Sequence, residues 1–173
     1  MANRAIIYAI YPNKIQEEQC RKTFGCCRFV HNQMLTIQQE RYKNGEKHLS
    51  KFQANTYCNQ HLKKEYLFLK EVDKFALTHA VYHLEDGYDR FFKHLSRFPK
   101  YKSKHKAKKS YTTNFTNGNI AVGDDYVKLP KLGGVKAKIH RKPEEDWKIK
   151  SATITQNRDG TYQVSILFEY IAC

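Results

Sequence analysis

The side chains in this sequence best suited to chemistry are Cys20, Cys27 and His31, which lie in a stretch with helical periodicity. Their spacing of seven and four residues places them on one face of a helix, where they could ligate zinc if a fourth group joined them. The same positions also form the apolar stripe of that stretch, and buried cysteines are common core residues. We therefore expect these three side chains to pack in the core, and the sequence predicts no metal site.

No other pattern in the sequence predicts catalysis. A nuclease or a phosphotransferase needs clustered carboxylates that bind metal ions, or a glycine-rich phosphate loop, and neither is present. The one acidic run, Glu144–Asp146, consists of consecutive residues that cannot all point at one metal ion, and it is more typical of a polar turn. We therefore expect the chain not to be an enzyme on its own, and binding is the function class that remains.

The charge of the chain indicates what it binds. Its 173 residues hold 31 Lys and Arg against 17 Asp and Glu, which gives a formal net charge of +14. A composition with 40% hydrophobic and 13% aromatic residues excludes a disordered basic tail. Signal-peptide and membrane-spanning patterns are absent, and the odd cysteine count does not fit a disulfide framework. We expect a cytoplasmic protein that binds nucleic acid and no membrane.

The positive charge is concentrated in one part of the chain. The stretch Arg90–Gly123 contains no acidic residue, and within it Lys100–Lys109 alternates lysines with polar residues and has no apolar face. Such a run is typical of an exposed loop. It is either a merely solvated loop or a contact to a phosphate backbone, and the interleaved aromatic residues Phe98, Tyr101 and Tyr111 favour the second interpretation.

Three helices are predicted before this loop. The first begins at a capping box that starts with Asn13 and ends at Asn44–Gly45, and the second begins at a similar box at Ser50. The third is capped by Asp73 and carries an unbroken apolar stripe over Leu77–Leu95.

Period-two patterns at both ends of the chain predict β-strands, with a hairpin turn over 157–160. The expected strands are Ala5–Tyr11, Ser110–Phe115, Ile120–Val122, Tyr126–Leu129, Val135–Ile139, Trp147–Thr155 and Tyr162–Tyr170. The first strand has no nearby partner, so we expect it to pair with the C-terminal strands. The fold class is then α+β: a small antiparallel barrel interrupted by a helical insertion. Its expected parts are the first strand (1–12), the helical insertion (13–97), the basic loop (98–109) and the rest of the barrel (110–173).

Several motifs carry a resemblance to a known family. In chain order they are Tyr11–Lys14, Thr23–Asn32, Lys70–Leu77, Phe98–Ser103, Ser110–Thr113, Lys128–Gly133, Lys150–Ile154 and Tyr162–Ser165. With them the sequence resembles the TnpB (OrfB) proteins, which accompany transposases in bacterial insertion sequences and are relatives of type V CRISPR effectors. The motifs occur in the family's order over essentially the whole chain.

The resemblance implies an RNA-guided DNA endonuclease lineage. In that family an OB-like wedge barrel, interrupted by a helical recognition domain, precedes a RuvC-like nuclease and a zinc-binding segment. This sequence stops at Cys173, before the family's catalytic carboxylates and CxxC pairs. The resemblance thus implies the recognition half without its nuclease, with Mg and Zn expected only in the missing half and no cofactor in this chain. A natural truncation, a split protein with a separate nuclease chain and an artificially shortened protein all stay open.

The family's wedge and recognition domains hold a structured guide RNA and read a short motif in the target double-stranded DNA. The positions that match its DNA-reading residues are Lys51, Asn55, Lys74, Thr78 and Thr113. Thr78 replaces a glutamine expected in some relatives, and its shorter side chain cannot make a bidentate contact to adenine. For the RNA we expect contacts from Lys100, Tyr101, Lys102, Lys104, Lys106, Lys108, Lys109 and Tyr111, joined by Lys128, Lys131, Lys136 and Lys138 on the barrel.

Two other functions stay open. The first two helices could form a guide-free helix-turn-helix regulator, although the gap from Asn44 to Ser50 is longer than the usual turn of that motif. Alternatively, the chain is the N-terminal half of a split nuclease, which requires a partner chain that supplies the carboxylates and the zinc motif.

Overall fold

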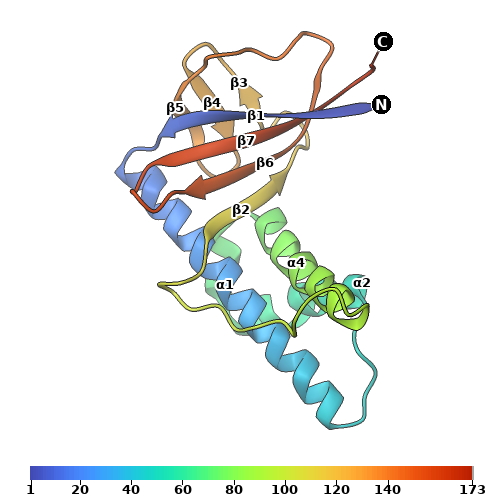
Figure 1. Cartoon of the computed structure of the whole chain (residues 1–173). Coiled ribbons are helices and arrows are strands. Elements are labelled where there is room, and N and C mark those ends of the chain that lie inside the picture. Colours follow the sequence, from blue (N-terminus) through green and yellow to red (C-terminus); the bar gives the residue numbers. More distant parts are fainter. Residues whose placement is uncertain (173) are drawn as a thin grey trace. The chain divides into compact units, whose positions relative to one another are not determined.

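The computed structural model describes residues 1–172, and the chain divides into two compact units. The sheet unit comprises residues 1–22 with 109–173, and the helical unit comprises residues 23–108 (Figure 1). Among the described residues, no helix is long and apolar enough to cross a membrane.

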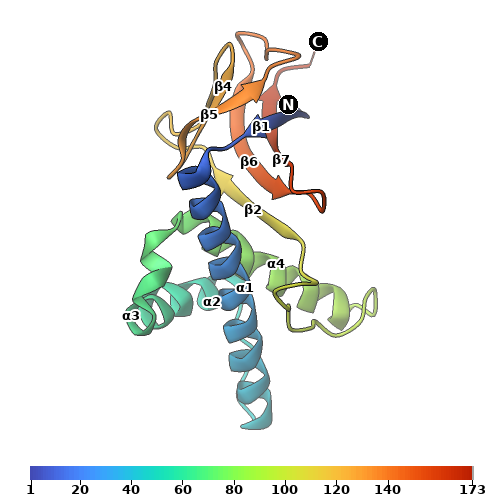
Figure 2. The ribbon, with the colours of Figure 1, turned by 90° about the vertical axis from the view of Figure 1, so that its left-hand side faces the viewer.

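The sheet unit contains one seven-stranded antiparallel sheet in the order β2-β6-β7-β1-β5-β4-β3 (Figures 1 and 2). Its strands are β1 (Ala2–Tyr11), β2 (Lys109–Asn114), β3 (Ala121–Val122), β4 (Tyr126–Leu129), β5 (Gly133–Lys138), β6 (Lys148–Gln156) and β7 (Tyr162–Tyr170). These bounds agree with the predicted strands to within two residues, except that β1 begins at Ala2, several residues before its predicted start. Strand β5 begins at Gly133 and Gly134, and the turn before it lies at Pro130–Leu132.

The first strand lies in the middle of the sheet. Its register with β7 runs from Ala2 opposite Tyr170 to Ile10 opposite Tyr162, and its last residues pair with β5. The prediction that this strand pairs with the C-terminal strands is therefore confirmed. The prediction of a barrel is wrong as regards closure, because the edge strands β2 and β3 do not pair within the described residues. With only two residues, β3 is too short to form a ladder along β2.

The pleat of the sheet separates a buried face from an open one. Ile6, Tyr8 and Ile10 of β1 are buried, as the alternation predicted, and they lie opposite apolar or aromatic residues of β7. One row of this buried face contains a polar residue, Thr113, which lies opposite Ala152 of β6. Thr113 is fully buried, and its hydroxyl has no hydrogen-bond partner among the described residues.

The helices lie between β1 and β2 in the sequence. They are α1 (Lys14–Lys43), α2 (Lys51–Tyr57), the π-helical η1 (Cys58–Leu62), α3 (Lys63–Glu65), the 3-10 helix η2 (Leu67–Glu71) and α4 (Lys74–Phe92). All three predicted caps are confirmed. Asn13 and Gln16 exchange side-chain bonds with each other's backbone N–H at 2.9 Å, Ser50 and Gln53 form the second box, and Asp73 accepts from the N–H of Phe75.

The predicted stripe on the third helix is correct only as far as Tyr88, the last buried residue of α4. The helix ends at Phe92, and Leu95, expected in the stripe, is 72% exposed. His94 adopts a positive φ of 59°, which is incompatible with continuing a right-handed helix. The apolar periodicity therefore continued past the true end of the helix.

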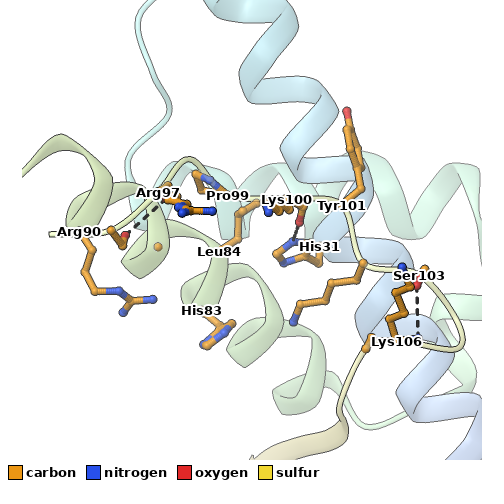
Figure 3. Close-up of a pocket in the computed structure, with 14 residues that line it drawn as sticks. His31, His83, Leu84, Arg90, Arg97, Pro99, Lys100, Tyr101, Ser103 and Lys106 are labelled. Atoms are coloured by element: carbon orange, nitrogen blue, oxygen red, sulfur yellow. Dashed lines mark hydrogen bonds between the residues drawn. The ribbon is translucent and has the colours of Figure 1, made fainter. Parts of the chain in front are cut away.

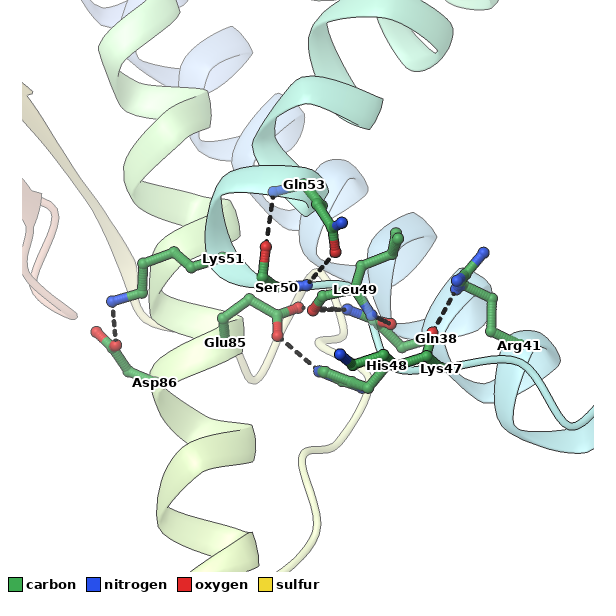
Figure 4. Close-up of polar contacts among 10 residues, drawn as sticks. All are labelled: Gln38, Arg41, Lys47, His48, Leu49, Ser50, Lys51, Gln53, Glu85 and Asp86. Carbon is green, nitrogen blue, oxygen red and sulfur yellow. Dashed lines mark hydrogen bonds and ion pairs between the residues drawn. The ribbon is translucent and has the colours of Figure 1, made fainter.

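A buried polar network holds the connection between α1 and α2 (Figure 4). The Glu85 carboxylate on α4 is buried, and it accepts hydrogen bonds from Gln38 Nε2 at 2.9 Å and from His48 Nε2 at 2.8 Å. Gln38 also bonds both backbone polar groups of Leu49. Each buried polar group thereby gains a partner, and the connecting segment is fixed against both helices.

The basic loop between α4 and β2 is fastened to α1 through its backbone. The His31 Nε2–H donates to the Lys100 carbonyl at 2.9 Å, and the Asn32 side chain bonds both the N–H and the carbonyl of Lys102. The Tyr101 hydroxyl contacts Thr36 Oγ1 at 2.8 Å and donates to Gln39 Oε1 at 3.2 Å. These contacts use the backbone and one tyrosine, so the lysine ammonium groups do not take part in the fastening.

Thr113→Val should raise the free energy of unfolding of the sheet unit by about 1 kcal/mol, because it removes a buried hydroxyl that has no partner. Thr112→Val is the matched control. The Thr112 hydroxyl bonds Thr153 Oγ1 at 2.8 Å on the opposite face, so this change should lower stability. Chemical denaturation of both variants measures the difference. A Thr113→Val variant less stable than Thr112→Val would contradict this description of the sheet.

His31 should make the helical unit less stable in acid. Burial, and more weakly Lys102 and His83, lower the pKa of His31 from 6.5 to about 4, against the opposing effect of its bond to Lys100. As pH falls from 6.5 towards 4, His31 becomes protonated in the unfolded chain but stays largely neutral in the folded chain. Stability should therefore fall by up to about 3 kcal/mol over that range.

Urea unfolding between pH 7 and pH 4 measures this dependence. His31→Gln should flatten it, whereas His61→Gln, which removes an exposed histidine, should leave it unchanged. Equal pH profiles for wild type and His31→Gln would show that His31 is not the group responsible.

Candidate nucleic-acid interface

The basic loop presents its cations to solvent. The side chains of its six lysines are all exposed, and none forms an ion pair with another described residue: Lys100, Lys102, Lys104, Lys106, Lys108 and Lys109. Unpaired like charges on a fastened backbone repel one another and attract a polyanion, whose counterions are released on binding. The loop therefore has the electrostatics and the rigidity of a phosphate-binding surface. Tyr101, expected to stack, is half exposed, with its hydroxyl held by α1.

Lys74 and Thr78 lie one turn apart at the start of α4. Lys74 is exposed and has no carboxylate partner among the described residues, and its Nζ lies 5.2 Å from the ring centroid of Phe75. A cation in the first turn of a helix opposes the helix dipole, so this position does not favour helix stability. Thr78 is half-buried, and its hydroxyl donates to the Lys74 carbonyl at 3.3 Å.

Lys51 and Asn55 lie one turn apart on α2, which packs against α4. Lys51 is paired with Asp86 at 2.5 Å and lies 5.2 Å from the ring centroid of Tyr82 (Figure 4). The hydrogen bond that Lys51 Nζ donates to the Asp86 carboxylate raises the pKa of Lys51. The structure thus attaches the α2 candidates to the same helix that carries Lys74 and Thr78. Lys51, unlike Lys74, already has a partner for its charge.

Two predicted contacts lie inside the sheet unit. Thr113 is fully buried, and Tyr111 is 6% exposed, on strand β2. The Tyr111 hydroxyl bonds the Cys20 thiol, which burial holds at a pKa of about 11. Neither side chain is exposed in the sheet unit. The predicted contacts of Thr113 with DNA and of Tyr111 with RNA therefore stay predictions.

The lysines predicted on the sheet lie on its open side. Lys128 on β4 and Lys136 and Lys138 on β5 are exposed, as is Lys131 in the turn between these strands. Lys128 also donates to the Gly118 carbonyl at 3.2 Å. These four cations belong to one edge region of the sheet, formed by consecutive segments of the chain.

Two tyrosines that the site prediction did not include lie beside these lysines. In the sheet register, Lys136 lies opposite Tyr126 of β4 and Tyr11 of β1, and residues directly opposite share a face. The tyrosines are 44% and 53% exposed. A cation between two exposed rings can bind a phosphate while bases stack on the rings. The register of β1 against β5 brings these tyrosines beside Lys136, and this register follows from the fold and not from any local sequence pattern.

The cysteines and His31 are engaged in packing. Cys27 Sγ contacts the Ala76 carbonyl at 3.5 Å, and burial raises the pKa of the Cys27 thiol to about 12. A thiol with that pKa is not a ready metal ligand or nucleophile. His31 donates through Nε2 to the basic loop. Within the described residues, no group of three or more His, Cys, Asp or Glu side chains could hold a metal ion.

The chain is similar to known proteins over most of its length. A family model described as a helix-turn-helix domain, and named for OrfB of IS605, matches residues 1–47. A protein of Streptomyces pristinaespiralis named as an RNA-guided DNA endonuclease is 29% identical over 168 residues, which cover 96% of this chain and 41% of that protein. InsQ of Escherichia coli K12, also named as an RNA-guided DNA endonuclease, is 26% identical over 96% of this chain and 40% of its own length.

A third relative is the virulence protein VsdF of Salmonella dublin, which is 31% identical over 59% of this chain and 94% of its own length. The chain spans about two fifths of the length of the two proteins named as endonucleases. The residues matched by the family model form strand β1, helix α1 and the turn after it, with no second helix among them. The family match and the similarity to these relatives over nearly the whole chain show that this protein belongs to the TnpB (OrfB) family and corresponds to the N-terminal part of its members.

Proposed function

We propose that this chain is an RNA-guided DNA-recognition module, which binds a structured guide RNA and a short motif in target double-stranded DNA. The observation that carries the proposal is the basic loop, whose lysines are exposed and unpaired while its backbone is fastened to α1. The names of two relatives, which call them RNA-guided DNA endonucleases, support the same function.

In this proposal the two units have different tasks. The sheet unit is the counterpart of the family's OB-like wedge domain, and the helices form the recognition insertion within it. The RNA lies against the basic loop and against the lysine and tyrosine row of β1, β4 and β5. Helices α2 and α4 face the DNA motif, with Lys74 as the side chain best placed for a base contact because its charge has no partner among the described residues.

Recognition in this proposal needs no metal from the chain itself. Mg and Zn would belong to a nuclease region outside these residues, which a separate chain could supply. Such a module would act at the nucleoid, where its DNA target is found. The guide-free alternative is disfavoured because α1 and α2 are separated by residues 44–50, a longer connection than a helix-turn-helix turn.

The proposal predicts that binding to duplex DNA depends on RNA. The chain should be purified from its native host with its bound nucleic acid and mixed with a library of duplexes in a gel-retardation assay. Treatment with RNase should abolish retardation of the selected duplex, and adding back the extracted RNA should restore it. Sequence-specific retardation that survives RNase would contradict an RNA guide and would favour the guide-free regulator.

Lys74→Ala should change which DNA motif is tolerated, with a loss of about 1–3 kcal/mol of binding free energy for the preferred duplex if Lys74 contacts a base. Lys70→Ala is the matched control, since Lys70 is an exposed lysine just before α4. Selection of bound duplexes from a random library measures the preference. An unchanged preference in Lys74→Ala would show that Lys74 does not read the motif.

A further inference from the structure

The helical unit contains a pocket of about 460 Å³ whose lining comes from three segments (Figure 3). Helix α1 contributes His31, helix α4 contributes His83, Leu84, Gly87 and Arg90, and the segment after α4 contributes the remaining side. A volume of this size is in the range of pockets that hold small organic ligands. All of the lining residues belong to the helical unit, so the pocket is a feature of that unit alone.

The lining is basic and contains no carboxylate. Five of its residues are arginines or lysines, and none of them forms an ion pair with a described residue: Arg90, Arg97, Lys100, Lys102 and Lys106. Partial burial, followed by the charges of Lys102 and Arg90, lowers the pKa of His83. The charges of Lys102 and Arg90 therefore act on a group that lines the pocket. So many unpaired like charges around one hollow favour an anionic occupant.

The walls also offer flat and apolar surface. Leu84 and Pro99 line the pocket together with the rings of His31 and His83, whereas the Tyr101 ring points away from it, towards Thr36 and Gln39 on α1 (Figure 3). Gly87 keeps this space open. A Cβ at that position would lie 3.7 Å from Pro99 Cγ and 3.9 Å from Arg90 Nη2, so a longer side chain would extend into the lining. An anion site bounded by a ring and a proline suits a ligand that joins a phosphate to a flat base.

We propose that this pocket binds one nucleotide of a single-stranded RNA segment, with the phosphate held by the cations and the base against Pro99 and the His83 ring. The inference rests on the proposed function and adds the place where an unpaired nucleotide is held. A duplex keeps its bases stacked inside, whereas a single strand can turn one base into a concave site. The arrangement would recognise an unpaired position in the guide RNA.

A charge-neutral variant gives the sharpest test. Gly87→Leu adds an apolar side chain to the pocket beside Pro99 and Arg90 without changing any charge, and it replaces a helical glycine by a better helix former, so the fold should be retained. Binding of a short single-stranded RNA to the full chain, after removal of bound nucleic acid, should weaken by about tenfold. Single-stranded DNA of the same sequence serves as the second probe, and a smaller loss for DNA is expected.

A second pair of variants tests the charge. Arg90→Gln with Arg97→Gln removes two cations of the pocket, whereas Lys64→Gln with Lys70→Gln removes two exposed cations of the same unit outside it. The first pair should weaken RNA binding by about tenfold more than the second. In wild type, bound RNA should protect Lys102 and Lys106 from acetylation more than Lys64.

The outcomes separate the two proposals. If wild type binds the RNA but Gly87→Leu binds equally well, or both charge pairs weaken binding equally, the pocket inference is wrong and the proposed function stands. A loss confined to DNA would overturn the assignment to RNA. If wild type binds neither the short RNA nor the RNA that accompanies it from the host, the proposed function and the pocket inference both fail.

Discussion

The pairing of the first strand with the last is the constraint on which the rest of the structure depends. Strand β1 occupies the middle of the sheet, with β7 on one side and β5 on the other, so its ten residues join strands from the opposite end of the chain. Because every backbone group of a central strand needs a partner, the sheet cannot be completed until the C-terminal strands are present. All of the helices consequently lie between β1 and β2 in the sequence, and the basic loop connects the last helix, α4, to β2.

The contacts of the basic loop explain how a lysine-rich stretch can be ordered. Six like charges within ten residues would normally favour a disordered loop. Here Asn32 bonds both backbone groups of Lys102, and His31 bonds the Lys100 carbonyl, so the backbone is fixed by uncharged partners. The ammonium groups stay outside these bonds and are free for phosphate. Burial lowers the pKa of His31 to about 4, so at neutral pH this bond is made by a neutral imidazole that donates through Nε2–H. The residue that first suggested zinc chemistry therefore holds the basic loop in place.

Local patterns in the sequence were enough to predict most of the elements. The caps at Asn13, Ser50 and Asp73 and the alternation of β1 were predicted because each depends on neighbours a few residues away. Closure of the sheet could not be predicted, since it depends on the length of β3 and on which edges meet. For the same reason the burial of Thr113 was not foreseen: its row is set by its pairing with β6. The pocket is lined by three separate segments of the chain, so the sequence alone showed only that the segment after α4 lacks acidic residues.

The central claim is that this chain holds one particular structured RNA, and sequencing the RNA that copurifies with it from its native host tests the claim most directly. The account predicts a single species, encoded near the gene for this chain, with a structured part shared by all molecules and protected from nuclease by the protein. A random sample of cellular RNA with the same abundance profile as the lysate, or no RNA at all, would contradict it.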